Sequence, residues 1–177
     1  MGRATEAITG EAERVEGGVL EELYLQHADR AMRVAYLLTG DRALAEDLVQ
    51  EAFLKLAGRF LHVRNRAAFE SYLRRTVVNL ANSHHRRRRV ERSTLSRSAG
   101  LRQPEPPQSD PGETDVLKRA LLRLPPRQRT AIVLRFYEDL SEQQTADAMR
   151  VAVGTVKSLV SRGRETLRTT MNTEEQE

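Results

Sequence analysis

Apolar residues recur along the chain at every third or fourth position, which is the spacing of one face of an α-helix. In the N-terminal half, this pattern predicts helices over residues 20–38 and 42–60, and a third that starts near residue 67 and enters the run SHHRRRR. Gly40 is expected to end the first helix and Asp41 to cap the second. No segment shows the strict alternation of a half-buried strand, so the pattern predicts an all-α first block.

A second helical block starts near residue 114. The segment DVLKRALLRL is expected to end at Pro125, and Pro126 suits the first turn of the next helix, PRQRTAIVLRFYED. Ser141 and Gln144 have the spacing of a capping box at the start of a short third helix. A turn at residues 150–152 leads into a fourth helix, VGTVKSLVSRGRETLR. A short capped helix, a turn and a second helix are typical of a helix-turn-helix.

The two blocks are separated by residues 91–113, ERSTLSRSAGLRQPEPPQSDPGE, which hold four of the six prolines. We interpret this segment as a flexible linker, because so few apolar side chains cannot offset the entropy lost on ordering the chain. Residues 1–18 are expected to form a disordered N-terminal tail and residues 172–177 an acidic tail. The predicted fold is therefore all-α, with two small helical domains, residues 19–90 and 114–171, joined by the linker.

Composition excludes several classes of protein. The 177 residues include no cysteine, which rules out disulfides, thiolate zinc sites and cysteine nucleophiles. The N-terminus lacks the apolar core of a signal peptide, and no run approaches the roughly 18 apolar residues of a membrane span, so we expect a cytoplasmic protein without membrane insertion. No P-loop, catalytic triad or carboxylate cluster is evident, so we expect no enzyme, no catalytic residue and no cofactor. We also expect no metal, because adjacent helical residues such as His84 and His85 point apart.

Both predicted domains are net basic, whereas the linker and the two tails are net acidic. Two basic bodies on a tether suit a polyanion that is contacted at two places. In the last helix Val156, Val160, Gly163 and Leu167 form an apolar stripe, and hydroxyl and cationic side chains occupy the other faces. The candidate DNA-reading residues are Thr155, Lys157, Ser158, Ser161, Arg162 and Arg164. Such donors suit phosphates and guanine edges in a major groove, and the alternative is a merely solvated helix.

These motifs resemble, in their order, the extracytoplasmic-function (ECF) group of the sigma-70 family of bacterial sigma factors. The stretch SEQQTADAMRVAVGTVKSLVSRGRETLR is similar to the helix-turn-helix that reads the promoter −35 element, and LLRLPPRQRTAIVLRFYEDLS to the helix pair before it. AYLLTGDRALAEDLVQEAFLKL resembles the family's core-polymerase-binding helix, and FESYLRRTVVNLANSHHRRRR its −10 recognition helix. The segments GDRALAEDLVQEAF and VVNLAN are closest to a subgroup common in actinobacteria.

The resemblance implies a non-catalytic initiation factor that binds core RNA polymerase, through the clamp and flap of its large subunit, and promoter DNA. An anti-sigma factor is a common partner in the family and would mask these surfaces. The implied polymerase-binding residues are Asp47, Gln50, Glu51 and Phe53. Acids beside an exposed aromatic ring suit a basic partner, and the open alternative is a solvated face with Phe53 buried.

The resemblance also implies that the third helix and the loop before it read and open the −10 element. The implied residues are His62, Arg64, Asn65, Asn79, Asn82, Ser83, His84, Arg86, Arg87 and Arg88. A loop pocket would hold a base extruded from the opened strand, and the arginines would contact phosphate. The alternative for the arginine run is a non-specific basic patch.

Three positions in the helix-turn-helix depart from the family's usual pattern. Arg150 stands where the turn usually has Gly, Ala152 where the reading helix usually has a Ser N-cap, and Leu159 where an Arg is frequent. Loss of the N-cap typically costs about 1 kcal/mol. These departures leave the fold plausible and bear on which −35 sequence is read.

The distance between the promoter elements constrains how the two predicted domains work together. The family's two elements lie on the order of 60 Å apart along the DNA. A flexible 23-residue linker averages about 25 Å from end to end and reaches roughly 80 Å when extended. Polymerase must therefore hold the domains apart, and we expect the free protein to bind promoters weakly. The rival interpretation, a stand-alone helix-turn-helix regulator, predicts a dimer on a palindrome and gives the acidic second helix no role.

Overall fold

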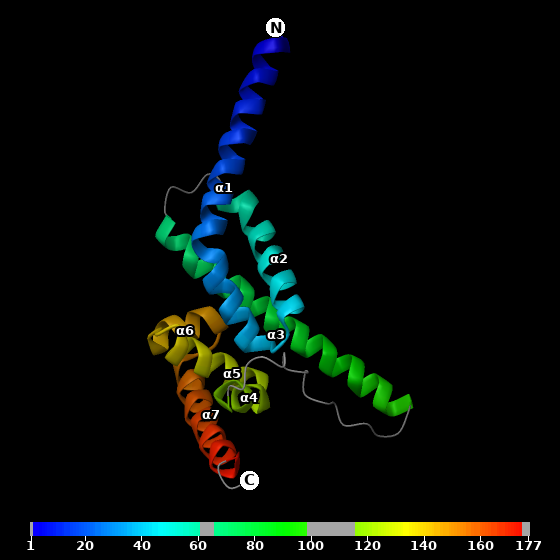
Figure 1. Ribbon diagram of the computed structural model, residues 1–177, viewed down its shortest axis with the longest axis vertical. Helices are drawn as coiled ribbons and strands as arrows, with labels where there is room; N and C mark the ends of the chain where they lie inside the picture. Colours follow the sequence, from blue (N-terminus) through cyan, green and yellow to red (C-terminus); the bar gives the residue numbers. More distant parts are fainter. Residues whose placement is uncertain (1, 61–65, 99–115, 175–177) are drawn as a thin grey trace.

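The computed structural model describes residues 2–60, 66–98 and 116–174, which fold into helices joined by turns (Figure 1). The N-terminal group of helices consists of α1 (Gly2–Thr39), α2 (Arg42–Phe60) and α3 (Arg66–Ser98). The C-terminal group consists of α4 (Val116–Arg123), α5 (Pro126–Ile132), a π-helical turn η1 (Val133–Tyr137), α6 (Glu142–Met149) and α7 (Val153–Glu174). No strand occurs within the described ranges, so the predicted all-α class is confirmed.

The break between α1 and α2 follows from two residues. Gly40 has a φ of +73°, a left-handed conformation that glycine adopts without steric cost, and its N–H donates to Tyr36 O at 2.7 Å. Asp41 Oδ1 accepts a hydrogen bond from Leu44 N–H at 3.1 Å and so caps the start of α2. The predicted stop and restart at these positions is confirmed.

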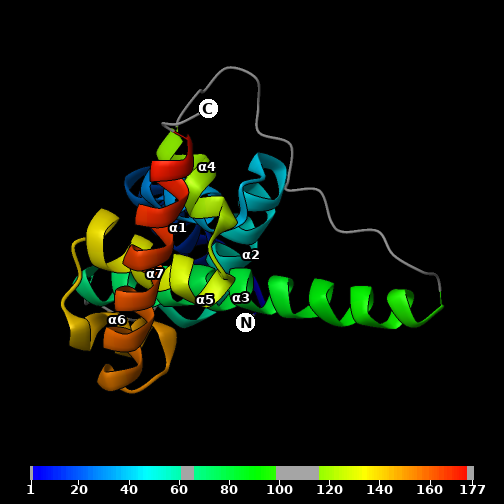
Figure 2. The same ribbon diagram turned by 90° about the horizontal axis from the view of Figure 1, so that it is seen from below.

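Three helices extend beyond the ranges that the pattern predicts. α1 begins at Gly2, within the segment expected to be a disordered tail; α3 continues to Ser98 and α7 to Glu174. The C-terminal part of α3 projects away from the other helices in both views (Figures 1 and 2). The domain boundaries proposed from the sequence stay predictions.

The segment after Pro126 differs from the single regular helix that the sequence predicts. Pro126 occupies the first turn of α5, as expected, but Val133–Tyr137 form a π-helical turn in which Glu138 N–H donates to Val133 O at 3.0 Å. Asp139 then takes a left-handed φ of +50°. The wider turn ends the helix and redirects the chain into α6.

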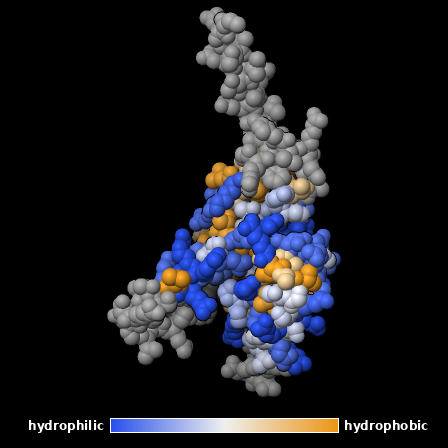
Figure 3. Space-filling view, turned by 180° about the vertical axis from the view of Figure 1, so that it is seen from behind, coloured by the Kyte–Doolittle hydropathy of each residue, from blue (hydrophilic) through white to orange (hydrophobic). Residues whose placement is uncertain are grey.

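The two groups of helices have separate cores and also share one. Phe53, Phe69 and Leu73 belong to the core of the N-terminal group, and Leu124 and Ile132 to that of the C-terminal group. The face shown in Figure 3 is largely hydrophilic, with small apolar patches.

A third buried cluster lies between the two groups. It contains Val34, Leu38, Leu48, Val78 and Ala81 from the N-terminal group and Val133, Leu134, Leu140, Ala148, Met149 and Leu159 from the C-terminal group. The sequence predicts two separate bodies, but the structure shows the two groups in contact. They associate because apolar residues occupy the facing sides of α1, α3, α5 and α6.

Candidate nucleic-acid interface

The predicted helix-turn-helix is formed by α6 and α7. Ser141 Oγ accepts a hydrogen bond from Gln144 N–H at 3.1 Å, and Gln144 Oε1 accepts one from Ser141 N–H at 2.8 Å. These reciprocal bonds satisfy donors at the start of α6, so the capping box is confirmed. At the other end of α6, Val151 N–H donates to Ala146 O at 3.0 Å and closes the turn.

The three departures from the family pattern have different structural consequences. Arg150 ends α6 in a left-handed conformation with φ +53°, the geometry that glycine adopts most readily. Ala152 precedes the first residue of α7 and has no side-chain oxygen to accept from the free N–H groups there. Leu159 is 8% exposed and belongs to the shared core, so it packs inward instead of lining the reading face.

The apolar stripe of α7 faces the rest of the C-terminal group. Val156 is fully buried, and Gly163 lies so close to α5 that a Cβ atom added to it would stand 2.9 Å from Ile132 Cγ1. Val160 and Leu167 are half-buried beside them. The predicted stripe is confirmed, with Leu159 as a further member.

The opposite side of α7 carries the predicted reading residues. Lys157, Ser161, Arg162 and Arg164 are exposed, and Thr155 and Ser158 are half-buried. Arg162 Nε donates to Ser158 O at 3.2 Å, and Lys157 Nζ lies 3.4 Å from Glu142 Oε2. Such exposed contacts are weak and exchange readily for phosphate oxygens. These side chains form an outward surface of three cationic and three hydroxyl residues, and Arg164 at its edge also lines a cavity beside α4 and η1.

The candidate −10 residues lie along α3, apart from three that fall outside the described residues: His62, Arg64 and Asn65. Ser83, Arg86, Arg87 and Arg88 are exposed, whereas Asn79, Asn82 and His84 are half-buried. Asn82 Oδ1 accepts a hydrogen bond from Thr130 Oγ1 at 3.3 Å, so α5 of the C-terminal group engages this candidate reading residue.

The surroundings of the two adjacent histidines of α3 lower the pKa of both side chains. Burial lowers the pKa of His84, and the charges of Arg88 and Arg87 lower it further. Burial also lowers the pKa of His85, against a raising effect of its hydrogen bond with Leu38 O at 3.0 Å. Among the described residues, no group of three His, Asp or Glu side chains is placed to hold a metal ion.

The candidate polymerase-binding surface on α2 needs one correction. Asp47, Gln50 and Glu51 are exposed, but Phe53 is only 4% exposed. Its ring lies between those of Tyr24 and Phe69, with centroids 4.9 and 5.7 Å away, so the expectation of an exposed aromatic is wrong.

The apolar residue on the exposed side of α2 is Leu54, 74% exposed, which sequence reasoning missed. Leu54 lies three, four and seven positions after Glu51, Gln50 and Asp47. This helical spacing is the signal that would have placed it beside the acidic residues.

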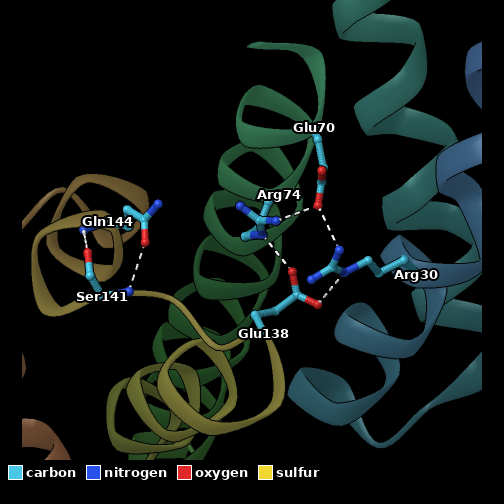
Figure 4. A network of polar contacts seen from close by, with 6 residues as sticks. All are labelled: Arg30, Glu70, Arg74, Glu138, Ser141 and Gln144. Atoms are coloured by element: carbon cyan, nitrogen blue, oxygen red, sulfur yellow. Dashed lines mark hydrogen bonds and ion pairs between the residues drawn. The ribbon is translucent and has the colours of Figure 1, made fainter. Parts of the chain in front are cut away.

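A buried ion-pair network was also missed. The Glu138 side chain is 2% exposed and contacts two arginines of the N-terminal group (Figure 4). Residues 138 and 30 are 108 positions apart, and spacing along the chain carries no signal for such a pair.

The C-terminal group contains a helix-turn-helix with cationic side chains on its outer face. The N-terminal group contains a long helix, α3, with a run of exposed arginines. These two features define a DNA-binding protein. Comparisons with known families sharpen this class. Residues 23–91 match the family model for sigma-70 region 2, and residues 114–167 match that for sigma-70 region 4.

Sequence and structural relatives of the chain are also sigma factors. The RNA polymerase sigma-E factor of Streptomyces coelicolor is 33% identical over 153 residues, covering 84% of this chain and 83% of that protein. The ECF RNA polymerase sigma factor SigE of Mycolicibacterium smegmatis is 37% identical over 160 residues, covering 84% of this chain and 60% of that longer protein. The sigma factor RpoE of Bartonella quintana, solved with the anti-sigma factor NepR, has a TM-score of 0.64 at 26% identity, covering 86% of this chain and 96% of RpoE.

The chain belongs to the sigma-70 family, in its extracytoplasmic-function group. As a sigma factor it binds core RNA polymerase and directs promoter-specific initiation; the stand-alone regulator is not favoured. None of the helices in the described ranges has the length and apolarity needed to cross a membrane.

Proposed function

We propose that α7 reads the −35 element and that α3, with the loop before it, reads and opens the −10 element. The observation that carries the −35 assignment is the outward cationic surface of α7, which directly follows the capped helix α6 and its tight turn. Arg162 and Arg164 supply donors for guanine edges and phosphates, and Lys157 supplies a point charge near the start of the helix. The residues assigned are Thr155, Lys157, Ser158, Ser161, Arg162 and Arg164.

For the −10 element, the exposed arginines of α3 carry the proposal. Arg86, Arg87 and Arg88 are exposed and lie in the C-terminal half of α3, the part that projects away from the other helices (Figures 1 and 2). Consecutive helical residues point in different directions, so together they track phosphates and do not grip a single one. Ser83 and His84 lie one turn earlier and are assigned to base contacts.

The polymerase contacts are assigned to two surfaces. On α2, Asp47, Gln50, Glu51 and Leu54 present an acidic surface with an exposed apolar side chain, which suits a basic helical partner. In the C-terminal group, α4, α5, η1 and α7 present apolar side chains, including Phe136 and Leu167, that line most of a cavity of about 490 Å³. Leu37 of α1 covers one side of this cavity. Phe136 is 58% exposed, and we assign the apolar surface that α4, α5, η1 and α7 contribute to this cavity to the polymerase flap.

The protein would contribute no catalysis of its own and would act where the polymerase is, in the cytoplasm. An anti-sigma partner that covers the same surfaces is consistent with the complex in which the related RpoE was solved. The chain itself carries no feature that identifies such a partner.

Run-off transcription with purified core polymerase on genomic fragments tests the proposed function. We expect new start sites that appear only when the protein is added. Arg162→Ala should weaken −35-dependent initiation by about 5- to 150-fold, the effect of about 1–3 kcal/mol for a lost base or phosphate donor. Glu165→Ala is the control, since Glu165 lies on the same helix and pairs only with Arg168 at 2.9 Å in the described contacts. Equal effects of the two variants would reject the assigned reading face.

A further inference from the structure

We propose that the contact between the two groups of helices is a self-inhibited closed state, latched by the buried carboxylate of Glu138, which must open before both promoter elements can be bound. The inference rests on the proposed function, because it concerns how the two DNA-reading helices become available together. Three observations support the inference. They are the apolar core that the two groups share, the ion pairs between the groups, and the short distance between α3 and α7 that results.

The latch is a network of four charged side chains (Figure 4). Glu138 Oε1 accepts a hydrogen bond from Arg30 Nε of α1 at 2.9 Å, and Glu138 Oε2 accepts one from Arg74 Nε of α3 at 2.6 Å. Glu70 Oε1 bridges the same two arginines at 2.9 and 2.7 Å. Both ion pairs of Glu138 therefore cross between the groups, and removal of its charge leaves Arg30 and the 12% exposed Arg74 to share the single carboxylate of Glu70.

The backbone around Glu138 is shaped to make this contact. The π-helical turn η1 ends at the residue before Glu138, and Asp139 after it has a φ of +50°, a conformation that few non-glycine residues adopt. Glu138 is thereby directed across the interface, away from its own group of helices (Figure 4). The irregular backbone at η1 and Asp139 thus has a consequence between the groups.

A second set of contacts joins the same surfaces at the end of α1. Arg129 is 6% exposed, and its guanidinium donates to Leu38 O of α1 and to Leu122 O of α4, both at 2.6 Å. Burial lowers the pKa of Arg129 to about 10, so it remains cationic at neutral pH, where the C-terminal carbonyls of α1 and α4 stabilise its charge. Gly40 packs so closely on Leu122 that an added Cβ atom would stand 2.7 Å from it.

The closed arrangement prevents simultaneous reading of the two promoter elements. α6 packs on α3, and α7 packs on α6. With helix axes about 8–10 Å apart at each contact, this part of α7 lies roughly 20 Å from α3. The promoter elements are on the order of 60 Å apart. In addition, Asn82, a candidate −10 residue, accepts a hydrogen bond from Thr130 of α5, so its Oδ1 is engaged between the groups in the closed arrangement.

Opening therefore has a free-energy cost that polymerase must supply. The apparent affinity for polymerase is reduced by the fraction of molecules that are open, so a variant that weakens the latch should bind more tightly without any new contact. Glu138→Gln keeps the shape of the side chain but removes the charge that two arginines share. We expect it to raise the open fraction about tenfold or more.

The full-length chain is suited to a distance measurement because it has no native cysteine. Spin labels on Ala43→Cys of α2 and Gln143→Cys of α6, both exposed positions, report the separation of the groups by pulsed electron resonance. We expect one short, narrow distance in the otherwise unchanged protein and a longer, broad one in Glu138→Gln. Asp29→Asn is the control, because it removes the same charge from an exposed site of α1.

Affinity for core polymerase, measured on the same proteins, provides the functional readout. We expect Glu138→Gln to bind about tenfold more tightly or better, and Asp29→Asn to bind as the parent does. Arg30→Gln, at a half-exposed position of the same network, provides a second opened variant if Glu138→Gln loses helical circular dichroism. A folded latch variant with the parent's distance and the parent's affinity would overturn the proposal.

Failure of this inference and failure of the proposed function give different results. If the parent protein initiates promoter-specific transcription and the latch variants change neither distance nor affinity, the latch is wrong and the function stands. If the latch variants open but neither they nor the parent binds polymerase or starts a transcript, the proposed function is wrong while the closed state itself is supported.

Discussion

The contact between α7 and α5 at Gly163 yields a quantitative prediction about how the reading helix is held. Gly163→Ala adds one methyl group where Ile132 Cγ1 would lie 2.9 Å and Ile132 Cδ1 3.2 Å away. Carbon atoms pack best at about 3.5–4.0 Å, so α7 or Ile132 must shift by roughly 0.5 Å or more. Ile132 is 6% exposed and has little room to move.

Two effects of opposite sign determine the magnitude. Overpacking of this kind typically costs about 1–3 kcal/mol, whereas replacing glycine by alanine inside a helix gains about 1 kcal/mol. We therefore expect Gly163→Ala to lower the free energy of unfolding by about 1 kcal/mol. Gly154, in the same helix, has no atom within 4 Å of its added Cβ, so Gly154→Ala should instead stabilise by about 0.5 kcal/mol.

Urea unfolding of the full chain, followed by far-ultraviolet circular dichroism, measures both variants. The double variant with Ile132→Val removes one of the two clashing atoms, so Gly163→Ala should cost less in that background than in the parent. An equal cost in both backgrounds, or stabilisation by Gly163→Ala similar to that by Gly154→Ala, would refute the close approach of α7 to α5.

Two further predictions concern the turn and the histidines. Arg150→Gly should raise the free energy of unfolding by about 1 kcal/mol in the same urea assay. The reason is that Arg150 ends α6 at φ +53°, a left-handed conformation that costs a non-glycine residue about 1–2 kcal/mol. An unchanged unfolding midpoint would contradict a left-handed conformation at this position. Because the pKa of His85 is lowered in the folded protein, the unfolded chain binds a proton first on acidification, so stability should fall as the pH drops through the ordinary histidine pKa of about 6.5. His85→Gln should make this pH dependence less steep, measured by thermal unfolding, and His84, whose pKa is also lowered, accounts for the part that remains. An equally steep dependence would show that His85 is not a source of it.

Much of the local structure of the site follows from short-range chemistry. Gly40 and Asp41, Pro126, and the pair Ser141 and Gln144 mark the helix ends, because each acts on backbone groups within a few residues of itself. The apolar stripe of α7 and its cationic outer side follow from helical periodicity alone. A helix-turn-helix and its candidate DNA-reading surface were therefore predictable.

Other features depend on which surfaces meet in three dimensions. The resemblance implied an exposed Phe53, whereas the rings of Tyr24 and Phe69 cover it and leave Leu54 exposed beside the acidic residues. Leu159, where the family often has Arg, is directed inward by the shared core. The π-helical turn after α5 is likewise not signalled by its residues, which would suit an ordinary helix.

By itself the amino-acid sequence determined the all-α class, the helix ends, the basic character of both halves and, through its motifs, the sigma-factor family, since these depend on neighbouring residues and on composition. Only the tertiary structure decided that the two groups of helices lie together with Glu138 buried between Arg30 and Arg74. Such a contact joins residues more than 60 positions apart. Its stability comes from exclusion of water by both surfaces at once, which no single segment can encode.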